Sequence, residues 1–204
     1  MLSFLPSILM PSTQSKTPPE EVMADYIMNR DKKAIMALYS EFSDDLYHYL
    51  LTLSDHTLAK DIVQKTWLKV IEKPHSYHTT GSVKAWLFTM ARNALIDEFR
   101  KTNRWVALDD TDVIKDAAIT KEIHYDTSQY ADTKHNIDTD NLQSSFDQAL
   151  MALSFEQREA FCLRQEGFSL AEIAHMTHSK QETIKTRLRY AKTKLKEWLE
   201  QAHD

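Results

Sequence analysis

The sequence predicts an all-α protein made of two small helical domains that are joined by an acidic linker. Apolar residues recur every three or four positions over most of the chain, as they do along one face of a helix. No stretch alternates apolar and polar residues for long, so strands are not expected. The 204 residues include only two glycines and five prolines. That is too little glycine for the phosphate-cradling loops of nucleotide-binding folds.

Cysteine usage and hydropathy limit where the protein works. The single cysteine, Cys162, excludes an internal disulfide framework and fits a reducing cytoplasm. No run approaches the roughly 18 apolar residues of a membrane span. The start, MLSFLPSILMPS, is apolar but lacks the charged beginning of a secretory signal. We expect a disordered leader over residues 1–24; translation from Met10 or Met23 is an alternative.

Residues 25–104 are predicted to form the first helical domain. Segment 30–53 carries apolar residues at helical spacing, and segment 58–73 repeats the pattern until Pro74 ends it. After a short polar loop, segment 83–104 carries a third apolar stripe. This third helix has five cations against two acids, a surplus of three positive charges.

Residues 105–141 are predicted to be a linker. Their periodicity is weak, and their composition is rich in Thr, Asp and Asn. They contain nine acids and three lysines, a local charge of −6. The net charge of −5 for the whole chain therefore hides an uneven distribution, and local charge decides which ligands a surface attracts.

Residues 142–204 are predicted to form the second helical domain. Three Ser-x-x-Glu/Gln patterns, in which two side chains satisfy backbone N–H groups at a helix start, begin at Ser154, Ser169 and Ser179. Gly167 stands where a helix end needs a left-handed residue. The expected helices cover about 155–165, 170–176 and 180–200. The last two, with the short turn between them, have the form of a helix-turn-helix.

The last predicted helix is strongly basic. Between Lys180 and Lys196 it has seven cations and one acid, a local charge of +6. At about 100° per residue, one stripe is apolar and consists of Ile184, Leu188, Ala191 and Leu195. The opposite face and its flank carry Glu182, Lys185, Thr186, Arg189, Tyr190 and Lys192. A helix in the major groove of DNA needs such base-contacting groups in front and cations beside them. The competing interpretation is a solvated basic face with no ligand.

Metal and catalytic sites are not expected. His175, His178 and Cys162 lack the paired spacing of zinc ligands, and His75 and His78 have the same weakness. Cys162 lies on an apolar helix, so core packing explains it better than a role as nucleophile. No set of catalytic side chains is apparent. We therefore predict that the protein is not an enzyme and has no cofactor.

Together, the two helical blocks resemble the extracytoplasmic-function (ECF) sigma factors of bacterial RNA polymerase. Residues 61–73, DIVQKTWLKVIEK, are similar to the family's polymerase-clamp-binding helix. Residues 81–101, GSVKAWLFTMARNALIDEFRK, resemble its promoter-melting helix. Residues 149–199 resemble its C-terminal helix-turn-helix. The similarity covers most of 25–103 and 142–200, in the family's order.

This resemblance implies roles for individual residues. The β′ clamp would be contacted by Asp61, Gln64 and Trp67. The minus-ten element would be contacted by Tyr77, Lys84, Arg92, Asn93, Arg100 and Lys101. The minus-thirty-five element would be contacted by Glu182, Lys185, Thr186, Arg189, Tyr190 and Lys192. The loop before the melting helix would receive a flipped base, which needs an aromatic or apolar pocket and hydrogen bonds.

The resemblance also implies a function. The protein would bind core RNA polymerase through the β′ clamp and β flap, direct it to promoter DNA, and melt the minus-ten region. An anti-sigma factor is a further expected partner. The linker would pass through the polymerase cleft; a simple tether is the alternative. The rival functions are a stand-alone helix-turn-helix regulator, which has no use for the first block, and a nuclease, which would need a carboxylate cluster.

Two residues depart from the family pattern. Lys65 stands where the family usually has an acid, so the clamp contact is expected to differ. His178 stands where the turn of the helix-turn-helix commonly has glycine. A residue other than glycine costs about 1 kcal/mol there if the backbone must be left-handed.

Overall fold

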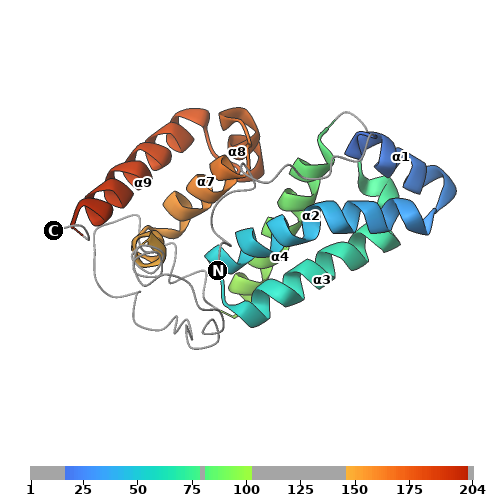
Figure 1. Ribbon diagram of the computed structural model, residues 1–204, viewed down its shortest axis with the longest axis horizontal. Helices are drawn as coiled ribbons and strands as arrows, with labels where there is room; N and C mark the ends of the chain where they lie inside the picture. Colours follow the sequence, from blue (N-terminus) through green and yellow to red (C-terminus); the bar gives the residue numbers. More distant parts are fainter. Residues whose placement is uncertain (1–16, 79–80, 103–145, 202–204) are drawn as a thin grey trace, which may run out of the picture. The chain divides into compact units, whose positions relative to one another are not determined.

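The computed structural model describes residues 17–78, 81–102 and 146–201 (Figure 1). The chain forms two compact units, whose described residues belong to 17–102 and 146–201 respectively. Each unit is a bundle of helices, and the described residues contain no strand. The predicted all-α fold with two helical domains is therefore confirmed. The predicted linker, 105–141, lies outside the described residues.

The described residues of the first unit form four α-helices and one 3-10 turn. These are α1 (Pro19–Asn29), α2 (Lys32–Leu53), α3 (His56–Glu72), η2 (Pro74–Ser76) and α4 (Val83–Lys101). Helix α2 packs against α1 and α3, and α4 packs against α3 and α2. Side-chain oxygens accept backbone N–H groups at the starts of α2, α3 and α4, and come from Asp31, Asp55 and Ser82. These caps define where each helix begins.

Helix α1 shows that the predicted disordered leader, residues 1–24, is too long. The last residues of that range form the first turns of α1, with Pro19 at a position where a helix does not need its N–H. Met23 is fully buried, and Tyr26 is buried beside it. A helix of 11 residues is marginal without packing partners, so its periodicity is a weak local signal. Residues 1–16 of the leader lie outside the described residues.

The core of the first unit fixes the orientation of α4. The fully buried residues of α2, α3 and α4 include Leu46, Tyr49, Leu50, Ile62, Leu87, Phe88 and Leu95. The rings of Tyr49 and Phe88 lie 5.1 Å apart, centroid to centroid. Burial of each large apolar side chain contributes about 1.5–3 kcal/mol. With one stripe of α4 held in this core, the other side of the helix faces outward.

The second unit contains helical residues 146–151, α7 (Phe155–Gln165), α8 (Leu170–Met176) and α9 (Gln181–Gln201). Helix α9 packs on both α7 and α8. Its buried residues within the described side chains are Ile184, Leu188, Ala191 and Leu195. The apolar stripe predicted for the basic helix is therefore confirmed.

A left-handed glycine ends α7. Gly167 has φ 90°, and its N–H donates to the carbonyl oxygen of Arg164 at 3.2 Å. The N–H of the next residue, Phe168, donates to Leu163 O at 3.2 Å. This pair of bonds is a Schellman motif, which satisfies carbonyls that the helix end leaves free. The predicted role of Gly167 is confirmed.

His178 ends α8 with the same geometry. Its φ is 53°, and the N–H groups of His178 and Ser179 donate to His175 O at 3.3 Å and Ala174 O at 2.9 Å. Because Ser179 closes α8 and α9 begins at Gln181, the predicted capping box at Ser179 is wrong. The box at Ser169 is complete.

The left-handed turn at His178 predicts a stability change with a defined sign. His178→Gly removes the steric cost of a side chain at positive φ, partly offset by the freedom of glycine in the unfolded chain. We expect it to raise the free energy of unfolding by about 0.5 kcal/mol, and His178→Val to lower it by more than about 1 kcal/mol. Urea unfolding of the full chain, followed by circular dichroism, measures both.

His175→Gly is the matched control, because His175 lies in the last turn of α8 with helical backbone. There glycine should lower the free energy of unfolding by about 1 kcal/mol. If glycine were destabilising at both positions, the left-handed turn would carry no cost at His178.

Candidate nucleic-acid interface

The outward side of α9 displays polar and aromatic groups in one row. Glu182, Thr186, Arg189 and Tyr190 are exposed, and Tyr190 is 51% exposed despite its size. The Arg189 guanidinium lies 5.3 Å from the centre of the Tyr190 ring. Such stacking restricts a long side chain and keeps its donors directed outward. This row offers donors, acceptors and an aromatic edge to a base pair.

Lys185 and Lys192 lie on the flank of the same helix, where both are exposed. The Lys185 Nζ lies 2.6 Å from Glu182 Oε1, an ion pair one turn apart. The Thr186 hydroxyl donates to Glu182 O at 3.0 Å. Exposed ion pairs of this kind contribute about 0–1 kcal/mol, so Lys185 can exchange its carboxylate for a phosphate at little cost.

Helix α4 presents three of its predicted site residues to solvent, namely Asn93, Arg100 and Lys101. Lys84, near the start of the helix, is partly exposed and pairs with Asp45 at 3.3 Å. Arg92 does not join them: it is only 8% exposed. Its position on the helix directs Arg92 into the packed side, and its expected contact with DNA stays a prediction.

Tyr77 is also buried, at 4% exposure, so its ring lies inside the unit; the expected contact of Tyr77 with the minus-ten element stays a prediction. Its ring lies 5.3 Å from that of Trp86, edge to face, and its hydroxyl donates to Gly81 O at 2.5 Å. Burial, and then the negative charge of Glu20, raise the pKa of the Tyr77 hydroxyl, which therefore remains a donor near neutral pH. Tyr77 supports the segment before α4 from inside the unit.

The clamp-contact residues predicted on α3 also divide. Asp61 and Gln64 are exposed, but Trp67 is 4% exposed and packs its ring 5.2 Å from that of Tyr39. Trp67 therefore lies in the core of the unit, and its expected contact with polymerase stays a prediction. Lys65, which replaces the family's usual acid, lies 3.6 Å from Glu98 of α4. Its charge thus meets an acid within the same unit.

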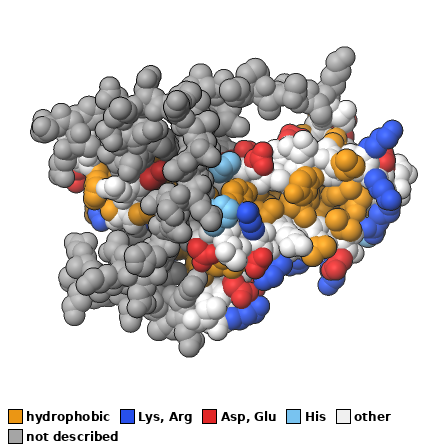
Figure 2. Space-filling model, turned by 60° about the horizontal axis from the view of Figure 1, so that its bottom comes forward, with side chains coloured by type: hydrophobic (Ala, Val, Ile, Leu, Met, Phe, Trp, Pro, Cys, Tyr) orange, Lys and Arg blue, Asp and Glu red, His pale blue; other side chains and the backbone are white. Residues whose placement is uncertain are grey.

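Several large apolar side chains of the first unit are exposed, which sequence periodicity did not indicate. Figure 2 shows apolar side chains gathered on one face of the first unit. The exposed large hydrophobic residues of α1, α2 and α3 are Met28, Met36, Tyr39, Leu68 and Ile71. We call this set the apolar patch. Tyr39, Leu68 and Ile71 fit the helical stripes of the sequence, and only packing shows that they remain uncovered. Exposed patches of this kind mark interaction surfaces.

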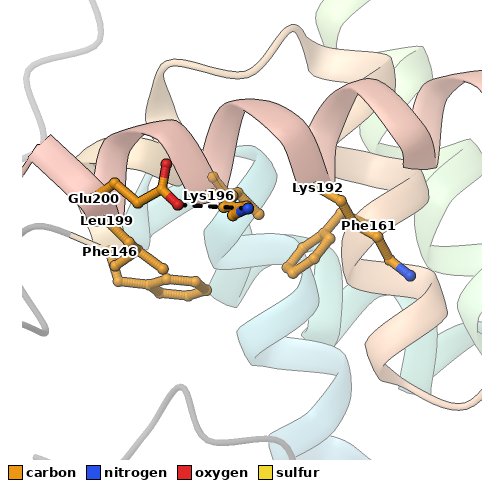
Figure 3. Close-up of a pocket in the computed structure, with 7 residues that line it drawn as sticks. Phe146, Phe161, Lys192, Lys196, Leu199 and Glu200 are labelled. Atoms are coloured by element: carbon orange, nitrogen blue, oxygen red, sulfur yellow. Dashed lines mark ion pairs between the residues drawn. The ribbon is translucent and has the colours of Figure 1, made fainter.

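A groove of about 660 Å³ lies along α9 in the second unit. Its lining consists of Phe146, Phe161, Lys192, Leu195, Lys196, Leu199 and Glu200. Figure 3 shows the rings of Phe146 and Phe161 on one side of α9, with Lys196 and Glu200 paired along the helix. These two charges lie 3.5 Å apart. Lys192 thus borders both the groove and the outward row of α9.

Two remaining observations concern metals and membranes. Within the described ranges, no three His, Cys, Asp or Glu side chains converge in a way that could hold a metal ion. Among the described helices, none combines the length and apolar character needed to cross a membrane.

Both units match families of bacterial transcription proteins. Sigma-70 region 2 matches residues 38–105, and sigma-70 region 4 matches residues 143–195. A two-unit helical protein with these regions, an outward basic helix and a helix-turn-helix is a transcription initiation factor.

Relatives define the subfamily. The chain is 31% identical over 163 residues to the ECF RNA polymerase sigma factor SigL of Mycobacterium tuberculosis, covering 76% of this chain and 82% of that protein. It is 39% identical over 74 residues to the ECF sigma factor SigM of Bacillus subtilis, covering 36% of this chain and 45% of SigM. The chain therefore belongs to the ECF RNA polymerase sigma factors, which direct promoter-specific transcription initiation. The family and function that the sequence indicated are confirmed.

Solved structures agree with this fold. The sigma factor RpoE of Bartonella quintana, in complex with the anti-sigma factor NepR, matches with a TM-score of 0.60 and 30% identity, covering 82% of this chain and 98% of that one. CnrH, in complex with the cytosolic domain of CnrY, matches with a TM-score of 0.62 and 16% identity, covering 89% of this chain and 97% of that one. The match to CnrH concerns the fold alone.

The burial of Trp67 predicts a loss of stability when its ring is removed. Trp67→Ala should lower the free energy of unfolding by about 3–5 kcal/mol, as large-to-small core substitutions do. Gln64→Ala, on the exposed side of the same helix, should change it by less than about 0.5 kcal/mol. Urea unfolding of the two variants provides the measurement. A Trp67→Ala protein as stable as wild type would contradict the assignment of Trp67 to the core.

Proposed function

We propose that separate surfaces of this sigma factor divide the work of initiation. The outward row of α9 contacts the minus-thirty-five element, and the exposed residues of α4 contact the minus-ten element. Asp61, Gln64 and the apolar patch bind core RNA polymerase. The observation that carries this proposal is the outward row of α9, which lies directly opposite a buried stripe and beside flanking cations.

On α9, the side chains suit major-groove contacts. An arginine donates two parallel hydrogen bonds to guanine, and threonine bonds to several base edges. Arg189 and Thr186 hold these groups outward, with Glu182 available as an acceptor for cytosine. Lys185 and Lys192 flank them at positions suited to phosphates, which add affinity without sequence preference.

On α4, Asn93, Arg100 and Lys101 are the direct contacts, and Lys84 joins them when a phosphate replaces Asp45. Their exposure supports this assignment. Arginine and lysine attract the backbone of a melted strand, and an asparagine can bond to a base edge. Tyr77 and Arg92 serve this surface from within, by packing behind it.

For binding to core polymerase, the apolar patch supplies the hydrophobic surface that the polar side chains of Asp61 and Gln64 lack. Charged and polar rim groups set orientation, whereas buried apolar contacts supply most of the affinity of a protein interface. Leu68 and Ile71 lie on the same helix as Asp61 and Gln64 and are exposed. We assign the β′ clamp to this face. We assign the β flap to the groove along α9, whose apolar floor suits a helical segment.

An anti-sigma factor is a proposed partner as well, because the RpoE relative was solved bound to one. The same apolar patch and groove would be covered in that complex, since an inhibitor that hides both excludes polymerase. The protein would act in the cytoplasm together with RNA polymerase. It carries out no reaction itself: the polymerase supplies the chemistry, and this chain supplies promoter choice.

Run-off transcription with purified core polymerase on a library of upstream regions tests the proposal. Arg189→Ala should reduce transcription from promoters that need the minus-thirty-five element about 10- to 100-fold, through the lost base contact. Core binding, measured by co-purification, should be unchanged. Asp61→Ala should do the reverse, weakening core binding without altering promoter preference. Equal loss of core binding in both variants would disprove this division of surfaces.

The apolar patch predicts a further effect on assembly. Leu68→Ser should weaken binding to core polymerase about tenfold, since it removes apolar surface from the interface. Lys60→Ser, also exposed on α3, is the control and should change binding by less than about twofold. Titration of core polymerase with labelled protein measures both. Equal affinity of the Leu68 variant and wild type would exclude the patch from the interface.

A further inference from the structure

Helix α1 precedes the segment that matches sigma-70 region 2, which begins at residue 38. The proposed surfaces use only one of its residues, Met28. The helix is nevertheless well packed, with Met23 and Tyr26 buried and contacts to α2, α4 and η2. At 1.5 Å per residue, its 11 residues span about 16 Å. A side chain at each end reaches one of the two helices that flank Tyr77.

At the C-terminal end of α1, Arg30 contacts the end of α3. Arg30 has left-handed backbone, with φ 54°, and its own N–H closes α1 on Tyr26 O. Its Nη1 donates to Ile71 O at 3.0 Å, across 41 residues of sequence. Ile71 lies in the last turn of α3, where carbonyls lack partners within the helix and a cation is favoured by the helix dipole.

At the N-terminal end of α1, Glu20 contacts the start of α4. Glu20 Oε1 accepts the N–H of Val83 at 3.2 Å, across 63 residues of sequence. Val83 is the first residue of α4, so its N–H has no partner within the helix, and a carboxylate there is favoured by the helix dipole. The cap residue Ser82 accepts the N–H of Ala85 at 3.3 Å. Two side chains from distant parts of the sequence, Glu20 and Ser82, thus accept N–H groups in the first turn of α4.

Tyr77 lies in the sequence between Ile71 and Val83, the two residues that α1 contacts. It also interacts with the start of α4 and the residues just before it. Its hydroxyl donates to Gly81 O, and its ring packs on Trp86 of α4. The charge of Glu20 contributes, after burial, to the raised pKa of Tyr77, which is consistent with a carboxylate close to this hydroxyl. Glu20, Tyr77 and the start of α4 therefore form one packed and hydrogen-bonded group.

We infer that Glu20 is a positioning residue for minus-ten recognition: its carboxylate fixes the first turn of α4 relative to Tyr77. Arg30 fixes the end of α3 from the other end of α1. The first turn of α4 is then already fixed when a minus-ten base binds. Binding therefore does not include the entropic cost of ordering that turn. The inference rests on the proposed contact between α4 and the minus-ten element.

The test measures minus-ten specificity with holoenzyme assembled from core polymerase and the full chain. A promoter used by the wild-type protein is compared with a copy whose minus-ten bases are replaced, and the two run-off yields give a ratio. Glu20→Ala should lower this ratio about fivefold. Glu20→Gln, whose amide oxygen still accepts the Val83 N–H, should stay within about twofold of wild type. Glu21→Ala, exposed in the same turn of α1, is the control and should match wild type.

Core binding and urea unfolding of the same variants separate positioning from folding. A lower ratio with unchanged core binding and unchanged preference for the upstream element supports the inference. A wild-type ratio in Glu20→Ala overturns it, as does a loss that only follows weaker core binding. If the wild-type protein itself starts no transcript, the proposed function fails. If it transcribes normally and Glu20→Ala leaves the ratio unchanged, only the inference about Glu20 fails.

Discussion

The burial of one stripe of α9 determines what the rest of the second unit can do. Helix α9 packs against α7 and α8 through Ile184, Leu188, Ala191 and Leu195, so the opposite row cannot turn inward. Arg189 therefore stays exposed, as its proposed contact with DNA requires. The left-handed residues Gly167 and His178 end α7 and α8 and turn the chain into the helix that follows each of them. A rotation of α9 by one residue, about 100°, would bury cations and expose the stripe. The packing of the apolar stripe therefore also determines which side chains of α9 are exposed for the proposed contact with DNA.

Charge on this chain is separated by segment. The net charge is −5, yet the segment 180–196 is strongly positive and the segment 105–141 is strongly negative. Within the units, several cations of the proposed interfaces rest on acids, as Lys185 does on Glu182 and Lys84 on Asp45. The exposed pair of Lys185 and Glu182 is weak, so phosphate can displace its carboxylate. An acidic protein can in this way carry surfaces proposed to bind DNA while its paired acids weaken non-specific attraction to other polyanions.

The sequence predicts elements whose signals are local and fails where packing decides. Helices α7 and α8 have the predicted bounds, because Ser154, Ser169 and Gly167 specify their ends by nearby hydrogen bonds. The buried stripe of α9 follows from periodicity alone. Trp67 and Tyr77 were assigned to surfaces by residue type and by position in a motif. An aromatic ring suits a core as well as a partner, and only the neighbouring helices decide which it meets.

Helix α1 marks the limit of local reasoning most clearly. Its bonds to Ile71 and Val83 span 41 and 63 residues, and nothing near Glu20 or Arg30 in the sequence indicates either partner. Each bond nevertheless obeys a simple rule, since an acid meets the start of a helix and a base meets the end of another. Two buried residues of the predicted minus-ten site, Tyr77 before α4 and Arg92 on α4, follow the same logic. Recognition surfaces made of a few exposed groups need buried groups behind them, so a family motif contains both kinds of residue. Position in the motif therefore indicates importance for the site, and burial supports the proposed division between residues that contact DNA and residues that hold them in place.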